Sequence, residues 1–166
     1  MNTHICIIMI GTLSVTAAKE MLQRNIVGRI GCTDGKRTYV VPVQYAFDGK
    51  DIFAHSVEGM KIHMMRKNPA VCFEVDDIQN LHNWKSVIAW GIYQELKEEH
   101  ERYAVLKLFA DRHIQLKISE TAMPPSGYFE KEFHLQPLSL RPVIYRIIIE
   151  EITGRFENSL VKGSIN

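Results

Sequence analysis

Residues 26–55 read IVGRIGCTDGKRTYVVPVQYAFDGKDIFAH and decide the fold class. Three runs rich in β-branched and aromatic residues occupy positions 26–32, 39–47 and 52–55, and an Asp-Gly pair lies between each run and the next. Asp-Gly between such runs is typical of a tight hairpin turn, because these two residues tolerate the positive φ that the turn requires. The stretch therefore predicts three consecutive antiparallel strands.

The spacing of apolar residues predicts three helices around this stretch. Ser14 is a good helix cap, and a helix is expected from there to Asn25. A second helix is predicted over 57–67, ending before Pro69 because the residue preceding a proline avoids the α conformation. A third is predicted over 98–112, with acidic residues first and basic residues late. Its predicted buried stripe consists of Tyr103, Leu106, Phe109 and Ala110.

Further strands are predicted over 71–75, 84–93 and 143–150, with a polar loop through residues 76–80 and another loop at 123–127. About six mostly antiparallel strands with flanking helices make an α+β fold, a small antiparallel β-barrel. Side chains fill the interior of such a barrel, so a ligand is expected on its outside or at a subunit seam.

The length of 166 residues predicts a single domain over 1–166, in which residues 1–13 form an N-terminal extension. The formal net charge is +1, which is too small for the broad basic surface that nucleic acid or an anionic membrane would need. We therefore expect no nucleic-acid partner, and any anion must be held locally.

Cysteine and histidine positions argue against disulfides and metals. Cys6, Cys32 and Cys72 are odd in number and far apart, so a reducing compartment, the cytoplasm, is expected. The histidines show no ligand spacing, so no metal site is expected. The apolar run 5–10 has no preceding Lys or Arg and is followed by polar residues, so neither an export signal nor a membrane span is predicted.

A candidate anion site lies in residues 53–61, where a strand ends in a polar turn and a helix begins. Backbone N–H groups at the helix start, the Ser56 hydroxyl, the small Gly59 and the Lys61 ammonium could together hold an anion. The alternative is a polar turn with a solvated lysine.

Five motifs in the chain occur in the order found in FMN-binding split-barrel proteins. They resemble most the pyridoxamine-5'-phosphate-oxidase-related branch, which includes nitroimidazole-resistance proteins, and the resemblance covers residues 14–155. The motifs are Val27 to Gly31, Tyr39 to Val43, His55-Ser56 with Gly59 and Lys61, Asn68 to Val75, and Trp84 to Val87.

The resemblance implies a homodimer with two FMN molecules in the seam between subunits. Lys61 would contact the FMN phosphate, and the isoalloxazine ring would lie along one strand and near a neighbouring one. The residues implied in the phosphate turn are Ser56, Gly59, Met60 and Lys61; those along the ring are Val40, Val41, Pro42, Val43, Ala54 and His55; those approaching it from the neighbouring strand are Trp84, Ser86 and Val87.

The resemblance further implies an FMN-dependent oxidoreductase that passes electrons from a nicotinamide donor to a small acceptor, with nitroaromatic compounds as one class. His55 is the candidate proton donor; its alternative role is packing at a strand end. No GxGxxG fingerprint is present, so a nicotinamide would visit without residing. The chain ends without the Arg-x-His element of pyridoxamine-phosphate oxidases proper, so vitamin B6 oxidation is not expected.

Two other functions remain open from the sequence. One is a non-catalytic FMN-binding module that stores or senses flavin. The other is haem binding, as in some split-barrel relatives, with His55 as an axial ligand.

Overall fold

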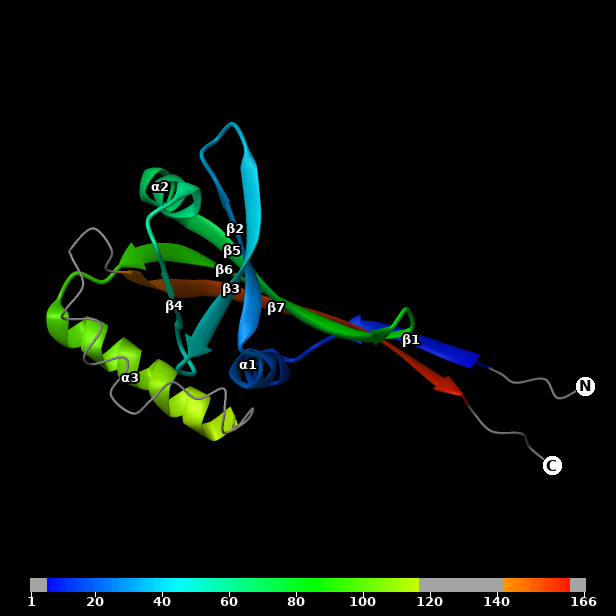
Figure 1. Ribbon diagram of the computed structural model, residues 1–166. Coiled ribbons are helices and arrows are strands. Elements are labelled where there is room, and N and C mark those ends of the chain that lie inside the picture. The colour runs from blue at the N-terminus through cyan, green and yellow to red at the C-terminus, as the bar shows by residue number, and fades with distance from the viewer. Residues whose placement is uncertain (1–5, 117–141, 162–166) are drawn as a thin grey trace, which may run out of the picture.

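The computed structural model describes residues 6–116 and 142–161, which form seven strands and three helices (Figure 1). All the strand pairings are antiparallel, and the predicted α+β barrel is confirmed. In chain order the elements are β1 (Cys6–Thr12), α1 (Val15–Arg24), β2 (Val27–Thr33), β3 (Thr38–Phe47), β4 (Ile52–Ser56), α2 (Met60–Lys67), β5 (Ala70–Asn80), β6 (Asn83–Glu95), α3 (Glu99–Leu116) and β7 (Val143–Val161).

The two Asp-Gly turns join β2, β3 and β4 as predicted. Gly35 and Gly49 have φ of 87° and 96°, a conformation that glycine adopts without steric cost. The side chains of Asp34 and Asp48 each accept two backbone N–H groups within their turns, at 2.7–2.9 Å. These bonds fix the short hairpins that set the register of the sheet.

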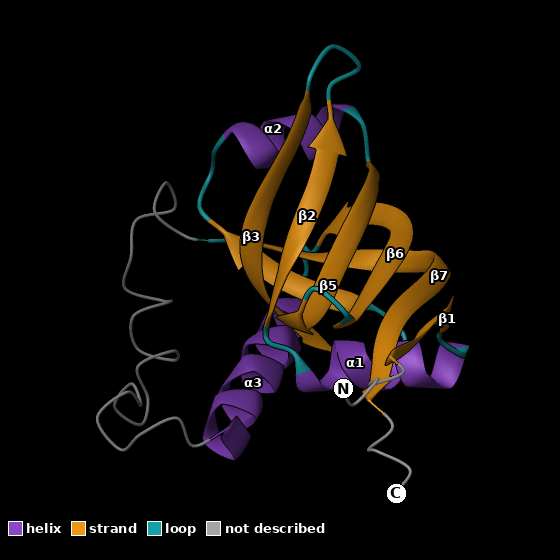
Figure 2. Ribbon diagram, turned by 90° about the vertical axis from the view of Figure 1, so that its right-hand side faces the viewer, coloured by secondary structure: helices purple, strands orange, loops and turns teal. Residues whose placement is uncertain are grey.

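Six strands close into a barrel because the long β7 pairs on both of its edges. The sheet order is β1-β7-β4-β3-β2-β5-β6, and β7 also pairs with β6. Ile147 shows the closure, since it lies opposite Ile52 of β4 and opposite Tyr93 of β6. Figure 2 shows β3, β2, β5 and β6 side by side in this order.

The barrel interior is filled with side chains, and two helices cover its ends. Tyr45 and Phe73 meet edge to face at 4.8 Å between ring centroids. Helix α1 contributes Met21 and Leu22 to this core, and α2 contributes Ile62 together with two methionines. Helix α3 instead packs outside on β3 and β4, over a smaller cluster. The filled interior leaves the outside of the barrel as the place where a ligand could bind.

One end of the sheet extends beyond the barrel as a tongue, which we define as β1, residues 76–86 of the β5–β6 hairpin and residues 155–161 of β7 (Figure 1). In this tongue the structure differs from the sequence predictions at two places. The N-terminal extension contains strand β1, because its apolar run pairs with the end of β7. The predicted loop 76–80 is wrong: β5 continues to Asn80, and ion pairs hold its two aspartates in the strand.

Helix predictions need smaller corrections. The second helix begins at Met60, because the extended Gly59 precedes it. In α3, Phe109 is buried as predicted, but Tyr103 is 53% exposed and does not belong to the buried stripe, and the buried Val105 was not predicted. Residues 123–127 lie outside the described part of the chain. In the ranges that the structure describes, no helix has the length and hydropathy needed to cross a membrane.

Candidate functional site

The turn between β4 and α2 leaves the start of a helix open to a ligand. Gly59 caps α2 without a side chain, and no side-chain hydrogen bond satisfies the first N–H groups of the helix. A Cβ added at Gly59 would have no other atom within 4 Å, so packing does not require a glycine there. Free N–H groups and the positive end of the helix dipole attract an anion. The predicted anion turn is thus open and unblocked.

Lys61 supplies a positive charge without a negative partner. Its side chain is half-buried, and no carboxylate in the described part of the chain lies within 4.0 Å of its ammonium. Burial lowers the pKa of Lys61 below its ordinary value, and only Cys32 opposes this shift. A desolvated cation without a counter-ion gains from binding an anion. Lys61 therefore remains a candidate for an anion contact.

The two other side chains of the turn contribute less. Ser56 donates its hydroxyl to the carbonyl oxygen of Val57 at 3.0 Å, so this hydroxyl stabilises the turn itself. Met60, which directly precedes Lys61, is 49% exposed.

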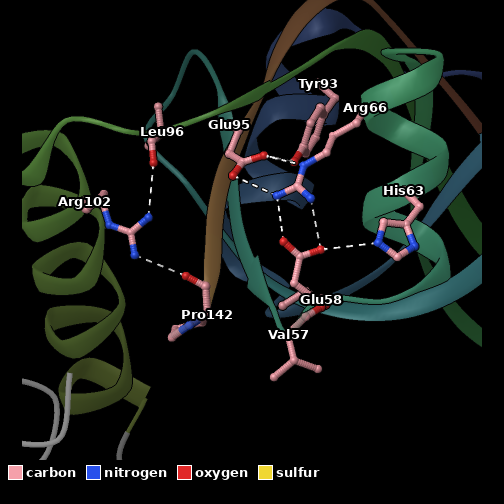
Figure 3. A network of polar contacts seen from close by, with 10 residues as sticks. Val57, Glu58, His63, Arg66, Tyr93, Glu95, Leu96, Arg102 and Pro142 are labelled. Carbon is pink, nitrogen blue, oxygen red and sulfur yellow. Dashed lines mark hydrogen bonds and ion pairs between the residues drawn. The ribbon is translucent and has the colours of Figure 1, made fainter. Parts of the chain in front are cut away.

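A network of ion pairs that the sequence analysis missed holds Glu58 in place (Figure 3). Arg66 of α2 contacts Glu58 at 2.8 Å and donates to both carboxylate oxygens of Glu95 at 2.8 and 3.0 Å. Tyr93 donates to Glu95 at 3.2 Å, and His63 lies 3.6 Å from Glu58. The network ties the turn to α2 and β6, and it neutralises a carboxylate that would repel an anion. No sequence spacing indicates it, since β6 lies far along the chain.

The predicted ring-binding strand divides its residues between two faces. Val40 and Pro42 point outward and are exposed, whereas Val43 is only 6% exposed and Val41 packs against the core. Successive strand residues alternate between faces, so only Val40 and Pro42 offer side chains to a ring outside the barrel. Pro42 also has no N–H group to donate.

The predicted ring-binding residues of strand β4 are also divided between the inner and the outer face of the barrel. Ala54 is 1% exposed and belongs to the core. His55 is half-buried on the outer face, where its ring meets the edge of Phe109 of α3 at 5.1 Å. Its position follows the last β3–β4 pair, Tyr45 with Ala54, so His55 continues the outer surface of β3 towards α3.

The three residues predicted on a neighbouring strand lie on β6, which is not adjacent to β3. Strands β2 and β5 intervene, so the separation is about 14 Å at the usual strand spacing. Trp84 donates its indole N–H to Glu157 at 3.0 Å within the tongue, and Ser86 donates to Glu74 at 3.1 Å. Val87 is fully buried. Within one chain, the structure does not bring them to the β3 surface.

Exposed apolar side chains on one face of the sheet were also missed. Strand pairing places the members of this set on the same outer side, although they come from five strands. The alternation of residues along each strand predicts which side chains point outward. Only the pairing of the strands shows that these side chains lie on the same side of the sheet. This outer apolar face consists of Ile10, Val27, Val40, Ile78 and Trp90, which are 40–67% exposed.

Two surface cavities accompany these features. The larger, about 450 Å³, lies along the tongue and α1, and its lining includes Arg24, Asp77 and Phe156. The smaller, about 370 Å³, adjoins the anion turn at Met60. The smaller cavity is the better candidate for an anion-binding site, because it adjoins the open start of helix α2. In the ranges 6–116 and 142–161, no three His, Cys, Asp or Glu side chains gather to hold a metal ion.

Comparison with known proteins connects this geometry to solved structures. An FAD-binding protein from Mesorhizobium loti is 30% identical over 89% of this chain and 97% of that protein, with a TM-score of 0.66. A candidate 5-nitroimidazole antibiotic resistance protein from Bacteroides thetaiotaomicron has a TM-score of 0.65 over 96% of this chain and 95% of that protein; at 15% identity it shows the fold alone. The split-barrel prediction is confirmed.

Among curated proteins, an uncharacterized protein of Rhizobium meliloti (strain 1021) is 37% identical over 78 residues. The matched part spans about half the length of that relative, 52%, and 45% of this chain. A family model described as pyridoxamine 5'-phosphate oxidase matches residues 14–156, which include all three helices and the whole barrel. The chain therefore belongs to the pyridoxamine 5'-phosphate oxidase family.

Proposed function

We propose that the chain binds the FMN moiety of a flavin and acts as a flavin-dependent oxidoreductase. The observation that carries the proposal is Lys61, a half-buried cation at an open helix start, with no carboxylate partner in residues 6–116 and 142–161. The flavin phosphate is the anion that suits it. The FAD-binding relative from Mesorhizobium loti, 30% identical over almost its whole length, supports a flavin as ligand.

The outer surface of β3 would hold the flavin ring. Val40 and Pro42 offer it an apolar, exposed surface on the outside of the barrel. Val43, Ala54 and Val87 are buried, so they would support this surface from inside the barrel.

A homodimer would complete the site. Trp84 and Ser86 lie about 14 Å from β3 within one chain, counted as three strand spacings, so they reach a ring on β3 only from a second copy. The exposed apolar side chains of the outer apolar face would support such a contact.

The bound flavin would supply hydride and electron transfer between a nicotinamide donor and a small acceptor, with nitroaromatic compounds as the first class to test. His55 would hold the proton for the acceptor, since it borders the β3 surface and an imidazole can both donate and accept a proton. Lys61 and the helix start would orient the cofactor through its phosphate.

The visible spectrum of the purified protein tests the cofactor, and anaerobic reduction tests the reaction. Flavin absorbance, bleaching by NADH or NADPH, and reoxidation by nitroaromatic compounds or quinones are expected. Bound flavin without turnover would indicate a non-catalytic module, and a Soret band would indicate haem. His55→Phe retains the ring contact with Phe109 and removes the proton, so it should keep flavin and lose acceptor reduction.

A further inference from the structure

A groove beside the anion turn has no role in the proposed binding of the FMN moiety. It lies between helix α2 and the turn of the β2–β3 hairpin, which projects beyond α2 in Figure 2. We call it the hairpin groove, and it is lined by Asp34, Arg37, Met60, His63, Met64 and Lys67. Its volume of about 370 Å³ is within the range of small-molecule sites.

One end of the groove lies beside the proposed position of the flavin phosphate. Met60 lines it and directly precedes Lys61, the proposed phosphate contact. The helical lining residues follow the spacing of one helix face, so the groove runs along α2 for about 10 Å, from Met60 to Lys67. A group attached to a phosphate at Lys61 would therefore lie one residue along α2 from the groove lining.

The charges of the groove suit an anionic ligand. Arg37 and Lys67 stand on opposite walls, and neither lies within 4.0 Å of a carboxylate in the described residues. Asp34 is the one acidic lining residue, and its carboxylate accepts the backbone N–H groups of Lys36 and Arg37. These two bonds are the main reason that the pKa of Asp34 is lowered. The lining keeps a net positive charge.

The floor of the groove suits an aromatic ring. Met60, which is 49% exposed, and Met64, which is 5% exposed and belongs to the core, both line it, and thioethers pack favourably against aromatic groups. His63 adds a planar ring on the exposed side of α2, with Glu58 3.6 Å from its Nε2. A ligand with a phosphate and a planar base would satisfy both the cations and the methionines.

We infer that the hairpin groove binds the adenylyl half of FAD. The inference rests on the proposed function, because the adenylyl group is attached to the phosphate assigned to Lys61. FAD has one phosphate more than FMN, and Arg37 and Lys67 contact it, while the adenine ring lies on Met60 and Met64. The chain therefore prefers FAD to FMN.

Affinities for riboflavin, FMN and FAD, measured by fluorescence titration of the full chain, test the two assignments separately. FMN should bind more tightly than riboflavin because of Lys61. FAD should bind at least about tenfold more tightly than FMN because of the groove. The double variant Arg37→Gln/Lys67→Gln should bind FAD no more tightly than FMN, with FMN affinity within about twofold of the wild type.

Lys36→Gln is the matched control, since it removes an exposed charge from the same hairpin outside the groove. It should keep the preference for FAD. FMN binding as tight as FAD binding, or an unchanged preference in the double variant, would overturn the groove assignment and leave the flavin proposal intact. Failure of all three flavins to bind would overturn both.

Discussion

Lys61 is the residue on which the flavin proposal depends most. Partial burial of an ammonium group costs free energy, and a bound phosphate would offset this cost. The same burial lowers the pKa of Lys61 from the ordinary value of 10.5, so it loses its proton at a lower pH than a solvated lysine. The structure thus connects a local desolvation to a measurable pH dependence.

We predict that flavin affinity falls with rising pH, starting below pH 10.5, as the free protein loses the Lys61 proton. In Lys61→Arg the guanidinium stays charged, so the fall should move to higher pH or vanish. Flavin fluorescence titrations between pH 7 and 10 measure this. The same pH profile in both proteins would show that Lys61 does not contact the phosphate.

Substitution by alanine should have different effects at Gly91 and at Gly59. At Gly91 a Cβ would collide with the backbone of Ile148 on β7, so Gly91→Ala should destabilise the fold by about 1–3 kcal/mol. At Gly59 a Cβ has open space, so Gly59→Ala should lose less stability but hinder the close approach of a phosphate. Urea unfolding and flavin titration of both variants separate the effects. A stable Gly91→Ala variant would contradict the observed strand contact.

At the scale of elements, the Arg66 network joins α2 to the β4–α2 turn and to β6. Hydrogen bonds from Arg66 are the largest cause of the lowered pKa of Glu95. A carboxyl group whose pKa is lowered by folding stabilises the native state above its unfolded pKa and loses this contribution as the pH falls through its folded pKa. The network therefore makes the position of the anion turn sensitive to acid.

We predict that Arg66→Gln lowers the free energy of unfolding by about 1 kcal/mol at pH 7, given the solvent exposure of the pairs. The difference from the wild type should shrink below pH 4.5, the ordinary value for Glu95, as the carboxylates become protonated. Urea unfolding across this range measures it, with Lys50→Gln as an exposed control. A difference that does not change with pH would rule out the ion pairs as its source.

Local sequence patterns predicted which strands are present better than they predicted where each strand ends. The Asp-Gly turns determine β2, β3 and β4, because turn chemistry acts within a few residues. The polar end of β5 was predicted as a loop, since its aspartates find partners only on α1 and β2. Strand β1 was missed because its pairing partner, the end of β7, lies almost at the other end of the chain.

The candidate site shows the same limit. Lys61 and the turn are local in sequence, and the structure has the predicted turn and helix start there, with Lys61 half-buried. The ring-binding residues were predicted as consecutive runs, whereas strand alternation leaves only Val40 and Pro42 outward on β3. Placing Trp84 near this strand requires the sheet order, which no local pattern contains.

At the scale of the whole molecule, the outer apolar face is the feature that a single chain leaves unexplained. Its five side chains belong to five strands and are all substantially exposed. Burying apolar surface gives about 25 cal/mol per Å², so a second copy covering this face would be favoured. A dimer would also bring Trp84 of one chain towards β3 of the other, as the proposed site requires.

We predict that Trp90→Glu converts the protein from a dimer to a monomer, because a buried charge without a partner opposes association. Tyr103→Glu is the matched control, since Tyr103 is similarly exposed but lies on α3, away from this face. Analytical ultracentrifugation of both variants gives the mass. A wild type that is already monomeric, or a dimeric Trp90→Glu variant, would contradict a seam on the outer apolar face.

The most direct test of the account is titration of the purified protein with FMN, beside the Lys61→Ala variant. The account predicts saturable binding by the wild type and a loss of about 10- to 100-fold in the variant, as expected for one charge-assisted phosphate contact. A wild type that binds no FMN, or a variant that binds it equally well, would contradict the central claim that the anion turn holds a flavin phosphate.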